Sequence, residues 1–146
     1  MTPSDATNRA TRQEWRDLGF YYDLDYDTKR WQFNGSKAGL LGFASMLRDY
    51  CGNLTNATLS EHDHFGPYMY LKVMTWTDCG IDENSIHGTL DDLNRLARLI
   101  ENTISTARTG DTIKLGYKYT PNSKFDLVLD IEDDDFDPAM MDSGIA

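Results

Sequence analysis

Glu61-His62-Asp63-His64 is the stretch of this sequence whose residue types come closest to a reactive or metal-binding site. In an extended segment His62 and His64 point to the same side, so their imidazoles could share a divalent metal ion. A zinc site uses three or four protein ligands, however, and the one remaining histidine is His87. The pattern therefore favours no metal site and histidines that hydrogen-bond a loop, with Glu61, His62, His64 and His87 as the alternative metal ligands.

A second stretch, Gly35-Ser36-Lys37-Ala38-Gly39, lies where a strand is expected to turn into a helix. A phosphate could meet the first N–H groups of such a helix together with the lysine. The glycine spacing of a P-loop is absent, so we favour a turn followed by a helix with Ser36 as its N-cap. No GxSxG or HExxH motif is found, which favours a binding protein without a cofactor over an enzyme.

The third stretch is acidic. The 146 residues carry a net charge of −10, and the segment from Phe125 to Ala146 contains eight acidic residues and no Lys or Arg. Such a surface repels nucleic-acid phosphates and attracts cationic proteins, although a run of charge is often only solvated. The expected partner-binding residues are Asp126, Asp130, Glu132, Asp133, Asp134, Asp135 and Asp137.

Aromatic residues could supply anchors for the same partner. Exposed tyrosine and tryptophan are enriched at the hot spots of protein interfaces, and an acidic rim around them suits a basic partner. Most of these rings are nevertheless expected in the core. The residues concerned are Tyr21, Tyr22, Tyr26, Tyr68, Tyr70 and Trp76.

The elements that position these residues follow from hydrophobic periodicity. Alternating residues predict a hairpin of strands from Phe20 to Leu24 and at Trp31 to Phe33. A helix follows from the cap at Ser36 to near Gly52, and Tyr68 to Trp76 is apolar on both faces apart from Lys72, as in a central strand. A second helix begins after Thr89, with Asp92 completing a capping box, and ends before Gly110.

Two further alternating runs, Ile113 to Tyr119 and Phe125 to Ile131, predict a final hairpin. If Tyr119 faces Phe125, Lys118 lies opposite Asp126 and Lys114 lies opposite Asp130. The element order ββαβαββ then predicts an α+β fold with one mostly antiparallel sheet of about five strands and two helices packed on it.

Composition and length bound the organisation of the chain. A hydrophobic fraction of 40% is enough for one core, so we expect a single domain over residues 13–137, a disordered segment over 1–12 and a flexible tail over 138–146. The polar N-terminus and the lack of a long apolar run predict a cytoplasmic protein without a membrane span. Cys51 and Cys79 form no CxxC pair, so both are expected as free thiols.

The run Trp31-Gln32-Phe33-Asn34-Gly35-Ser36-Lys37-Ala38-Gly39-Leu40, followed by an apolar helix and then by His62 and His64 before a strand, resembles the immunity proteins of bacterial polymorphic toxin systems. The resemblance is greatest to the family numbered thirty-two and covers residues 31–76. It implies a small cytosolic protein that binds and blocks one cognate toxin and has no catalysis of its own.

Two functions are therefore weighed. The first is an immunity-type or antitoxin-type inhibitor that neutralises a basic, nuclease-like toxin through its acidic surface. The second is a small metal-dependent hydrolase or ligand-binding protein that uses the stretch from Glu61 to His64.

Overall fold

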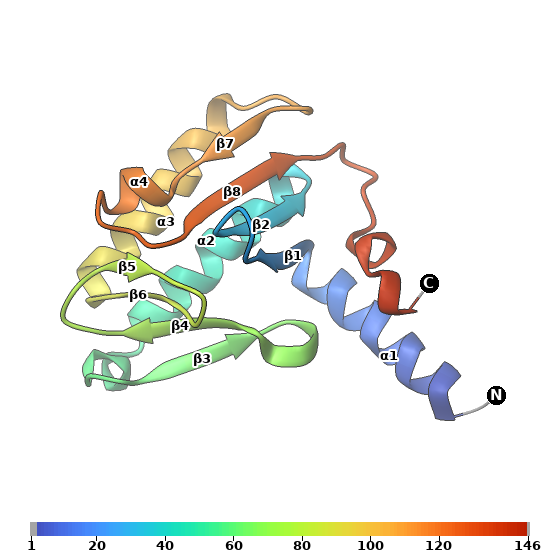
Figure 1. Ribbon diagram of the computed structural model, residues 1–146, viewed down its shortest axis with the longest axis horizontal. Helices are drawn as coiled ribbons and strands as arrows, with labels where there is room; N and C mark the ends of the chain where they lie inside the picture. Colours follow the sequence, from blue (N-terminus) through green and yellow to red (C-terminus); the bar gives the residue numbers. More distant parts are fainter. Residues whose placement is uncertain (1–2, 146) are drawn as a thin grey trace.

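Two four-stranded sheets and two long helices form the core of an α+β fold. The computed structural model describes residues 3–145. Sheet A has the strand order β1-β2-β8-β7 and sheet B the order β3-β4-β6-β5. Figure 1 shows sheet A above sheet B, with two of the long helices behind them, the N-terminal helix beside them and both chain ends on the same side.

Sheet A is built from distant parts of the chain. It comprises β1 (Phe20–Asp25), β2 (Arg30–Gly35), β8 (Asp126–Ile131) and β7 (Thr112–Lys114). The predicted N-terminal hairpin is confirmed, because β1 and β2 pair antiparallel. β2 and β8 pair parallel, so the sheet is mixed. β1 is one edge of this sheet.

Sheet B consists of short strands. These are β3 (His62–Phe65), β4 (Leu71–Thr75), β6 (Ile86–Gly88) and β5 (Gly80–Ile81). β4 lies between β3 and β6, so the predicted central strand is confirmed in its place but begins only at Leu71. The residues before it form the 3-10 turn η2 (Pro67–Met69).

Both predicted helices are present. α2 (Lys37–Gly52) begins after Ser36, whose hydroxyl accepts a hydrogen bond from the Gly39 N–H at 3.1 Å. α3 (Leu90–Thr106) begins with a complete capping box between Thr89 and Asp92. The turn after α2 continues as the 3-10 helix η1 (Leu54–Ala57).

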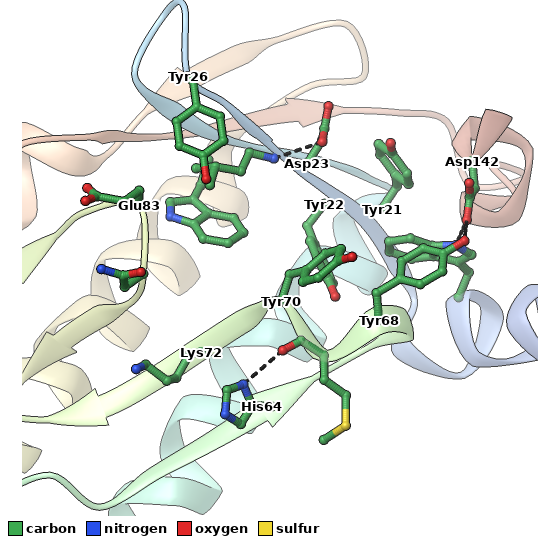
Figure 2. Close-up of a pocket in the computed structure, with 15 residues that line it drawn as sticks. Tyr21, Tyr22, Asp23, Tyr26, His64, Tyr68, Tyr70, Lys72, Glu83 and Asp142 are labelled. Carbon is green, nitrogen blue, oxygen red and sulfur yellow. Dashed lines mark hydrogen bonds between the residues drawn. The ribbon is translucent and has the colours of Figure 1, made fainter. Parts of the chain in front are cut away.

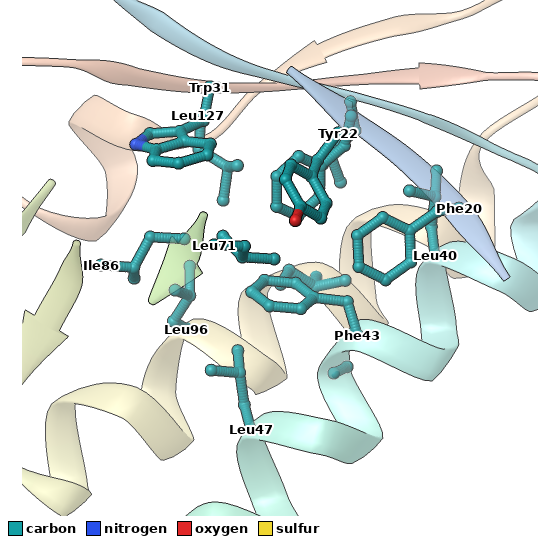
Figure 3. Close-up of a cluster of buried hydrophobic side chains, with 14 of the residues drawn as sticks. Phe20, Tyr22, Trp31, Leu40, Phe43, Leu47, Leu71, Ile86, Leu96 and Leu127 are labelled. Atoms are coloured by element: carbon teal, nitrogen blue, oxygen red, sulfur yellow. The ribbon is translucent and has the colours of Figure 1, made fainter. Parts of the chain in front are cut away.

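The apolar stripes of the two helices close the core against both sheets. Phe43 and Leu47 of α2 and Leu96 of α3 point toward Leu71 and Ile86 of sheet B (Figure 3). Phe20 of sheet A stacks on Phe33 with ring centroids 4.9 Å apart, and Phe43 meets both rings edge-on. Both sheets therefore pack against the same apolar core, so neither sheet requires a separate layer of helices.

The prediction of one sheet with about five strands is wrong. β5 and β6 contain two and three residues, which is too short for an alternating pattern to show in the sequence. Two parallel pairings, β2 with β8 and β4 with β6, also replace the expected antiparallel order. Parallel neighbours are joined by long crossovers, so nothing in the local sequence marks them.

The predicted register of the last hairpin is also wrong. Lys114 pairs with Val128 rather than Asp130, and Lys118 lies in the one-turn helix α4 (Gly116–Tyr119). Asp126 accepts a hydrogen bond from the Gly116 N–H at 2.8 Å, and a Cβ at Gly116 would come within 2.5 Å of that carboxylate. At this close contact the chain leaves the strand and forms the helical turn α4. Tyr119 is therefore buried in the core from a helix rather than from a strand.

The two ends of the chain differ from the expectation of disorder. Residues 3–12 belong to α1 (Pro3–Leu18), while residues 1–2 lie outside the described part. Most of α1 is exposed and polar, and Trp15 is its one fully buried side chain among the described residues. A helix with a single fully buried apolar side chain shows little apolar periodicity in its sequence, so hydrophobic periodicity does not predict it.

The expected flexible tail packs against α1. Residues 138–145 form η3 (Pro138–Met141) and η4 (Ser143–Ile145), with Ala139 and Ile145 buried; residue 146 lies outside the described part. An ion pair joins Arg16 to Asp137 at 3.0 Å, and Arg12 Nη2 donates to the Ile145 carbonyl at 2.6 Å. Each terminal segment therefore holds the other in place.

Every helix within residues 3–145 falls short of the length and apolar character that crossing a membrane requires.

Candidate functional site

The three histidines of the alternative metal site do not converge. His62 and His64 lie in β3 with ring centroids 5.2 Å apart, on one face of sheet B. The strand register runs from His62 through Met74 to His87, so His87 is two strand spacings away, about 10 Å. Among residues 3–145, no three His, Cys, Asp or Glu side chains are grouped so that they could hold a metal ion.

Each histidine of β3 hydrogen-bonds the backbone instead. His62 Nδ1 donates to the Ser60 carbonyl and His64 Nδ1 to the Met69 carbonyl, both at 2.9 Å. Because a carbonyl can only accept, Nδ1 is the donor in both hydrogen bonds. His64 therefore ties β3 to the turn before β4.

Four of the seven expected partner-binding acids already have partners within the chain. Asp126 binds the Gly116 N–H, and Asp130 accepts from Gln32 Nε2 at 2.8 Å and Thr112 Oγ1 at 2.6 Å. The other two pairs are Asn34 Nδ2 to Glu132 at 3.3 Å and Arg16 to Asp137 at 3.0 Å. These carboxylates stabilise sheet A and α1.

The remaining three acids, Asp133, Asp134 and Asp135, are exposed in the turn between β8 and η3. Asp133 Oδ1 accepts a hydrogen bond from the Asp135 N–H at 3.0 Å, which shapes the turn. The part of the acidic segment that is open to a partner is therefore this turn.

A cleft of about 570 Å³ lies between the edge of sheet A and the start of β4. We call it the tyrosine cleft, because it is lined by Tyr21, Tyr22, Tyr26, Tyr68 and Tyr70. Its wall on one side comes from β1 and the turn that follows, and on the other side from η2 and β4 (Figure 2). Large side chains stand exposed around it: Tyr26 by 66%, Tyr68 by 48%, Met69 by 60% and Tyr70 by 68%. Of the six aromatic residues discussed above only Tyr22 is buried, so the expectation that most lie in the core is wrong.

Strand β1 divides its side chains between the cleft wall and the core. Tyr21 and Asp23 share its outer face, whereas Tyr22 turns inward beneath the cleft. The Tyr22 hydroxyl lies within hydrogen-bond distance of two acceptors, the Pro67 carbonyl at 2.5 Å and the Phe65 carbonyl at 3.0 Å, and burial raises the pKa of Tyr22 to about 12. Tyr22 thus fixes the distance between sheet A and the segment that leads into η2.

The opposite wall is held in an unusual backbone conformation. Tyr68 and Met69 have φ values of 65° and 56°, which side chains other than glycine rarely adopt. Gly66 before them has φ 76°, and a Cβ there would come within 2.6 Å of the Tyr22 ring. Strain of about 1–3 kcal/mol per residue persists only where surrounding contacts hold it, and such residues cluster at ligand sites.

Three contacts hold this turn. The Tyr68 hydroxyl donates to Asp142 Oδ2 at 2.6 Å, and the rings of Tyr68 and Tyr70 stack with centroids 5.7 Å apart. His64 supplies the third contact through the Met69 carbonyl. The wall of the cleft is therefore formed in advance rather than on binding.

Asp142 is the buried polar centre at the end of the cleft. Its carboxylate accepts from Trp15 Nε1 at 2.9 Å and from the Gly144 N–H at 2.9 Å, besides Tyr68. Burial alone would raise the pKa of Asp142, but the hydrogen bonds from Tyr68, Trp15 and Gly144 lower it below its usual value. The hydrogen bond between Tyr68 and Asp142 raises the pKa of Tyr68 to about 12.

Charges of both signs border the cleft. Asp23 lies on β1 and Glu83 on the turn between β5 and β6, and Lys72 and His64 lie on β4 and β3 (Figure 2). Aromatic faces next to carboxylates attract Lys and Arg side chains through cation–π and ionic interactions. The arrangement is suited to binding a cationic group against the β1 side.

Two residues of the alternative metal site, His64 and His87, line two different clefts. His64 lines the tyrosine cleft, whereas His87 lines a second cleft of about 680 Å³ next to Cys79 and Asp92. In the second cleft His87 Nδ1 lies 2.9 Å from Ser85 Oγ, and Arg95 Nη2 lies 3.8 Å from Cys79 Sγ. His64 and His87 therefore do not line a common binding site.

No family model matches this chain, and comparisons with curated proteins and with solved structures find no similar protein.

Proposed function

We propose that this protein is an inhibitory binding protein of the immunity type, which neutralises a basic, nuclease-like toxin and anchors it in the tyrosine cleft. The observation that carries the proposal is the cluster of exposed Tyr26, Tyr68, Met69 and Tyr70 around one preformed cleft with acidic side chains at its border. Soluble domains rarely leave such a cluster exposed unless it binds something.

The side chains around the cleft are of the types that anchor protein partners. Tyrosine combines a large apolar face with a polar tip and loses little entropy on binding, because it has two side-chain torsions. Tyr68 is already fixed by Asp142 and by stacking on Tyr70. A surface that is ordered before binding avoids part of the entropy cost of association.

The acidic turn contributes in a different way. Asp133, Asp134 and Asp135 are exposed on a chain with a net charge of −10, so they attract a basic protein over a distance. Exposed charges act mainly on the rate of association, whereas buried aromatic anchors act on dissociation. The proposal therefore assigns the encounter to the acidic turn and the lasting contact to the cleft.

The test is capture of a partner from the native cell lysate with three forms of the protein. The wild type is expected to retain one basic protein in equal amount, and Tyr70→Ala is expected to lose it because its exposed ring borders the cleft. Tyr117→Ala is the matched control, since Tyr117 is 61% exposed on α4 and does not line the cleft.

Purified partner must then be inhibited by the wild type and not by Tyr70→Ala. Equal retention by both variants would remove the cleft from the mechanism. The absence of any stoichiometric partner at low salt would overturn the inhibitor proposal itself.

A further inference from the structure

We propose that the partner enters the cleft as an extended basic segment that pairs with the open edge of β1 and continues sheet A as a fifth strand. The inference rests on the proposed function, because it states how the partner of that same cleft is held. It follows from the backbone of β1, from the side chains next to it and from their charge.

Hydrogen bonds to β8 show which way the backbone of β2 faces. Asp126 N donates to the Lys29 carbonyl at 2.9 Å and Glu132 N to the Gly35 carbonyl at 2.8 Å. Odd-numbered residues of β2 therefore face β8, and even-numbered residues face β1.

The same alternation identifies the free backbone groups of β1. In the antiparallel register Gln32 pairs with Asp23 and Asn34 with Tyr21, so these pairs exchange the ladder hydrogen bonds. The N–H and C=O groups of Tyr22 and Leu24 consequently point away from β2, toward the open edge.

These edge groups have no backbone partner. Within residues 3–145, no backbone hydrogen bond outside the regular elements involves Tyr22 or Leu24. The Leu24 N–H is bonded instead to the carboxylate of the neighbouring Asp23 at 3.0 Å. An incoming strand can replace that exposed local bond and gain the ladder that an edge strand offers.

The cleft lies along this edge. Tyr21, Tyr22, Asp23 and Leu24 line it in succession, so a strand added to β1 would run through it. Alternate side chains of that strand would point to the outer face of sheet A and into the cleft. Those side chains of the added strand that point into the cleft would contact Tyr68 and Tyr70 on the opposite wall.

Charge identifies the segment as basic. Asp23 and Asp25 stand on the outer face of β1, directly beside the position of the added strand. Acidic side chains on an edge strand repel acidic or apolar edges, including that of a second copy of this chain. An Arg or Lys opposite Asp23 would instead form a cross-strand ion pair.

The first test uses capped octapeptides rather than the unidentified partner. The probe alternates Arg and Thr, and its controls are the same peptide with alternate backbone nitrogens methylated and an alternating Glu and Thr peptide. Hydrogen exchange of single amides is followed by NMR. Saturation with the Arg peptide is expected to slow exchange at Tyr22 and Leu24 by about tenfold or more, since a ladder bond forms only there.

The controls separate strand pairing from charge attraction. Neither the methylated peptide nor the Glu peptide is expected to protect these amides. Protection by the methylated peptide, or no protection by the Arg peptide, would overturn the proposal. Asp23→Lys is expected to abolish protection while Asp49→Lys retains it, and circular dichroism establishes that both variants are folded.

The captured partner then distinguishes the two proposals. A stoichiometric complex in which Tyr22 and Leu24 exchange as fast as in the free protein would overturn strand addition and leave the inhibitor standing. Peptide protection without any stoichiometric partner would overturn the inhibitor and leave the strand site standing.

Discussion

Asp142 is the residue through which the N-terminal helix, the cleft wall and the C-terminal segment meet. Asp142 is buried, and its carboxylate accepts hydrogen bonds from Trp15, Tyr68 and Gly144. Removing the charge leaves three donors facing a weaker acceptor. The consequence of this convergence is that one side chain controls both stability and the shape of the cleft.

Asp142→Asn is expected to lower the free energy of unfolding by about 1–3 kcal/mol, the usual loss when buried hydrogen bonds to a charged group are broken. Urea denaturation measures it. Asp134→Asn is the matched control, because Asp134 is exposed, and it is expected to change stability by less than about 0.5 kcal/mol. Equal stability of the two variants would show that Asp142 has no structural role.

The pH dependence of the same contact has a definite sign. The pKa of Asp142 is lowered in the folded protein, so its contribution is present above the unfolded pKa of about 4 and is lost as the pH falls through the folded value. Acid is therefore expected to release the Trp15 indole N–H, which NMR follows directly. Asp142→Asn should remove this transition at Trp15, and persistence of the transition in the variant would assign it to another group.

Side chains that form the cleft are visible in the sequence, but their grouping is not. Tyr21, Tyr26, Tyr68 and Tyr70 were identified as possible anchors, yet the pattern gave no reason to place residues 26 and 70 around one cleft. Their grouping depends on the Tyr22 bond to the Phe65 carbonyl and on the left-handed turn at Tyr68 and Met69. Both are tertiary features that residue spacing does not encode.

Among the elements, α3 has the clearest local signal. Thr89 Oγ1 accepts from the Asp92 N–H at 3.1 Å, and Asp92 Oδ2 accepts from the Thr89 N–H at 3.0 Å. Its cap and its buried stripe were both predictable, because each depends on residues three or four apart. Helices with such signals are read from sequence more reliably than sheets.

Thr89→Ala is expected to lower the free energy of unfolding by about 1 kcal/mol, because it leaves the Asp92 N–H without its acceptor at the helix start. Thermal and urea unfolding measure the change. Thr106→Ala, at the exposed last turn of the same helix, should cost less. A larger loss at Thr106 would show that the cap does not limit the stability of α3.

The pairing and register of the strands are the features that the sequence predicts least well. β1, β2, β4 and β8 are predictable because they alternate or are continuously apolar, whereas the parallel pairings of β2 with β8 and of β4 with β6, and the division into two sheets, are not. The β7–β8 register was misread because Asp126, assigned to a surface ion pair, binds the backbone of Gly116. A side chain that satisfies a distant backbone group is indistinguishable in sequence from one that faces solvent.

For the whole molecule, the proposed role of charge predicts a kinetic effect. Replacing Asp133, Asp134 and Asp135 together with Asn should slow association with the partner and weaken its salt dependence, with little change in dissociation. Stopped-flow or surface-based kinetics measure both rates. The matched control replaces Asp49, Asp63 and Asp78, which are also exposed, by Asn. Equal slowing by both sets would show that only net charge matters.

The pairing of β2 with β8, and of α1 with residues 137–145, has a consequence for the order of synthesis. On the ribosome, Trp15 and the inner edge of β2 emerge long before Asp142 and β8, which are their partners. A nascent chain must therefore hold a strand with one unpaired edge and an uncovered indole until residues 126–142 have emerged. Contacts so far apart in sequence also slow folding. We expect the domain to fold only once residues 126–142 have emerged rather than stepwise as its earlier elements appear, with a need for chaperone protection in that interval.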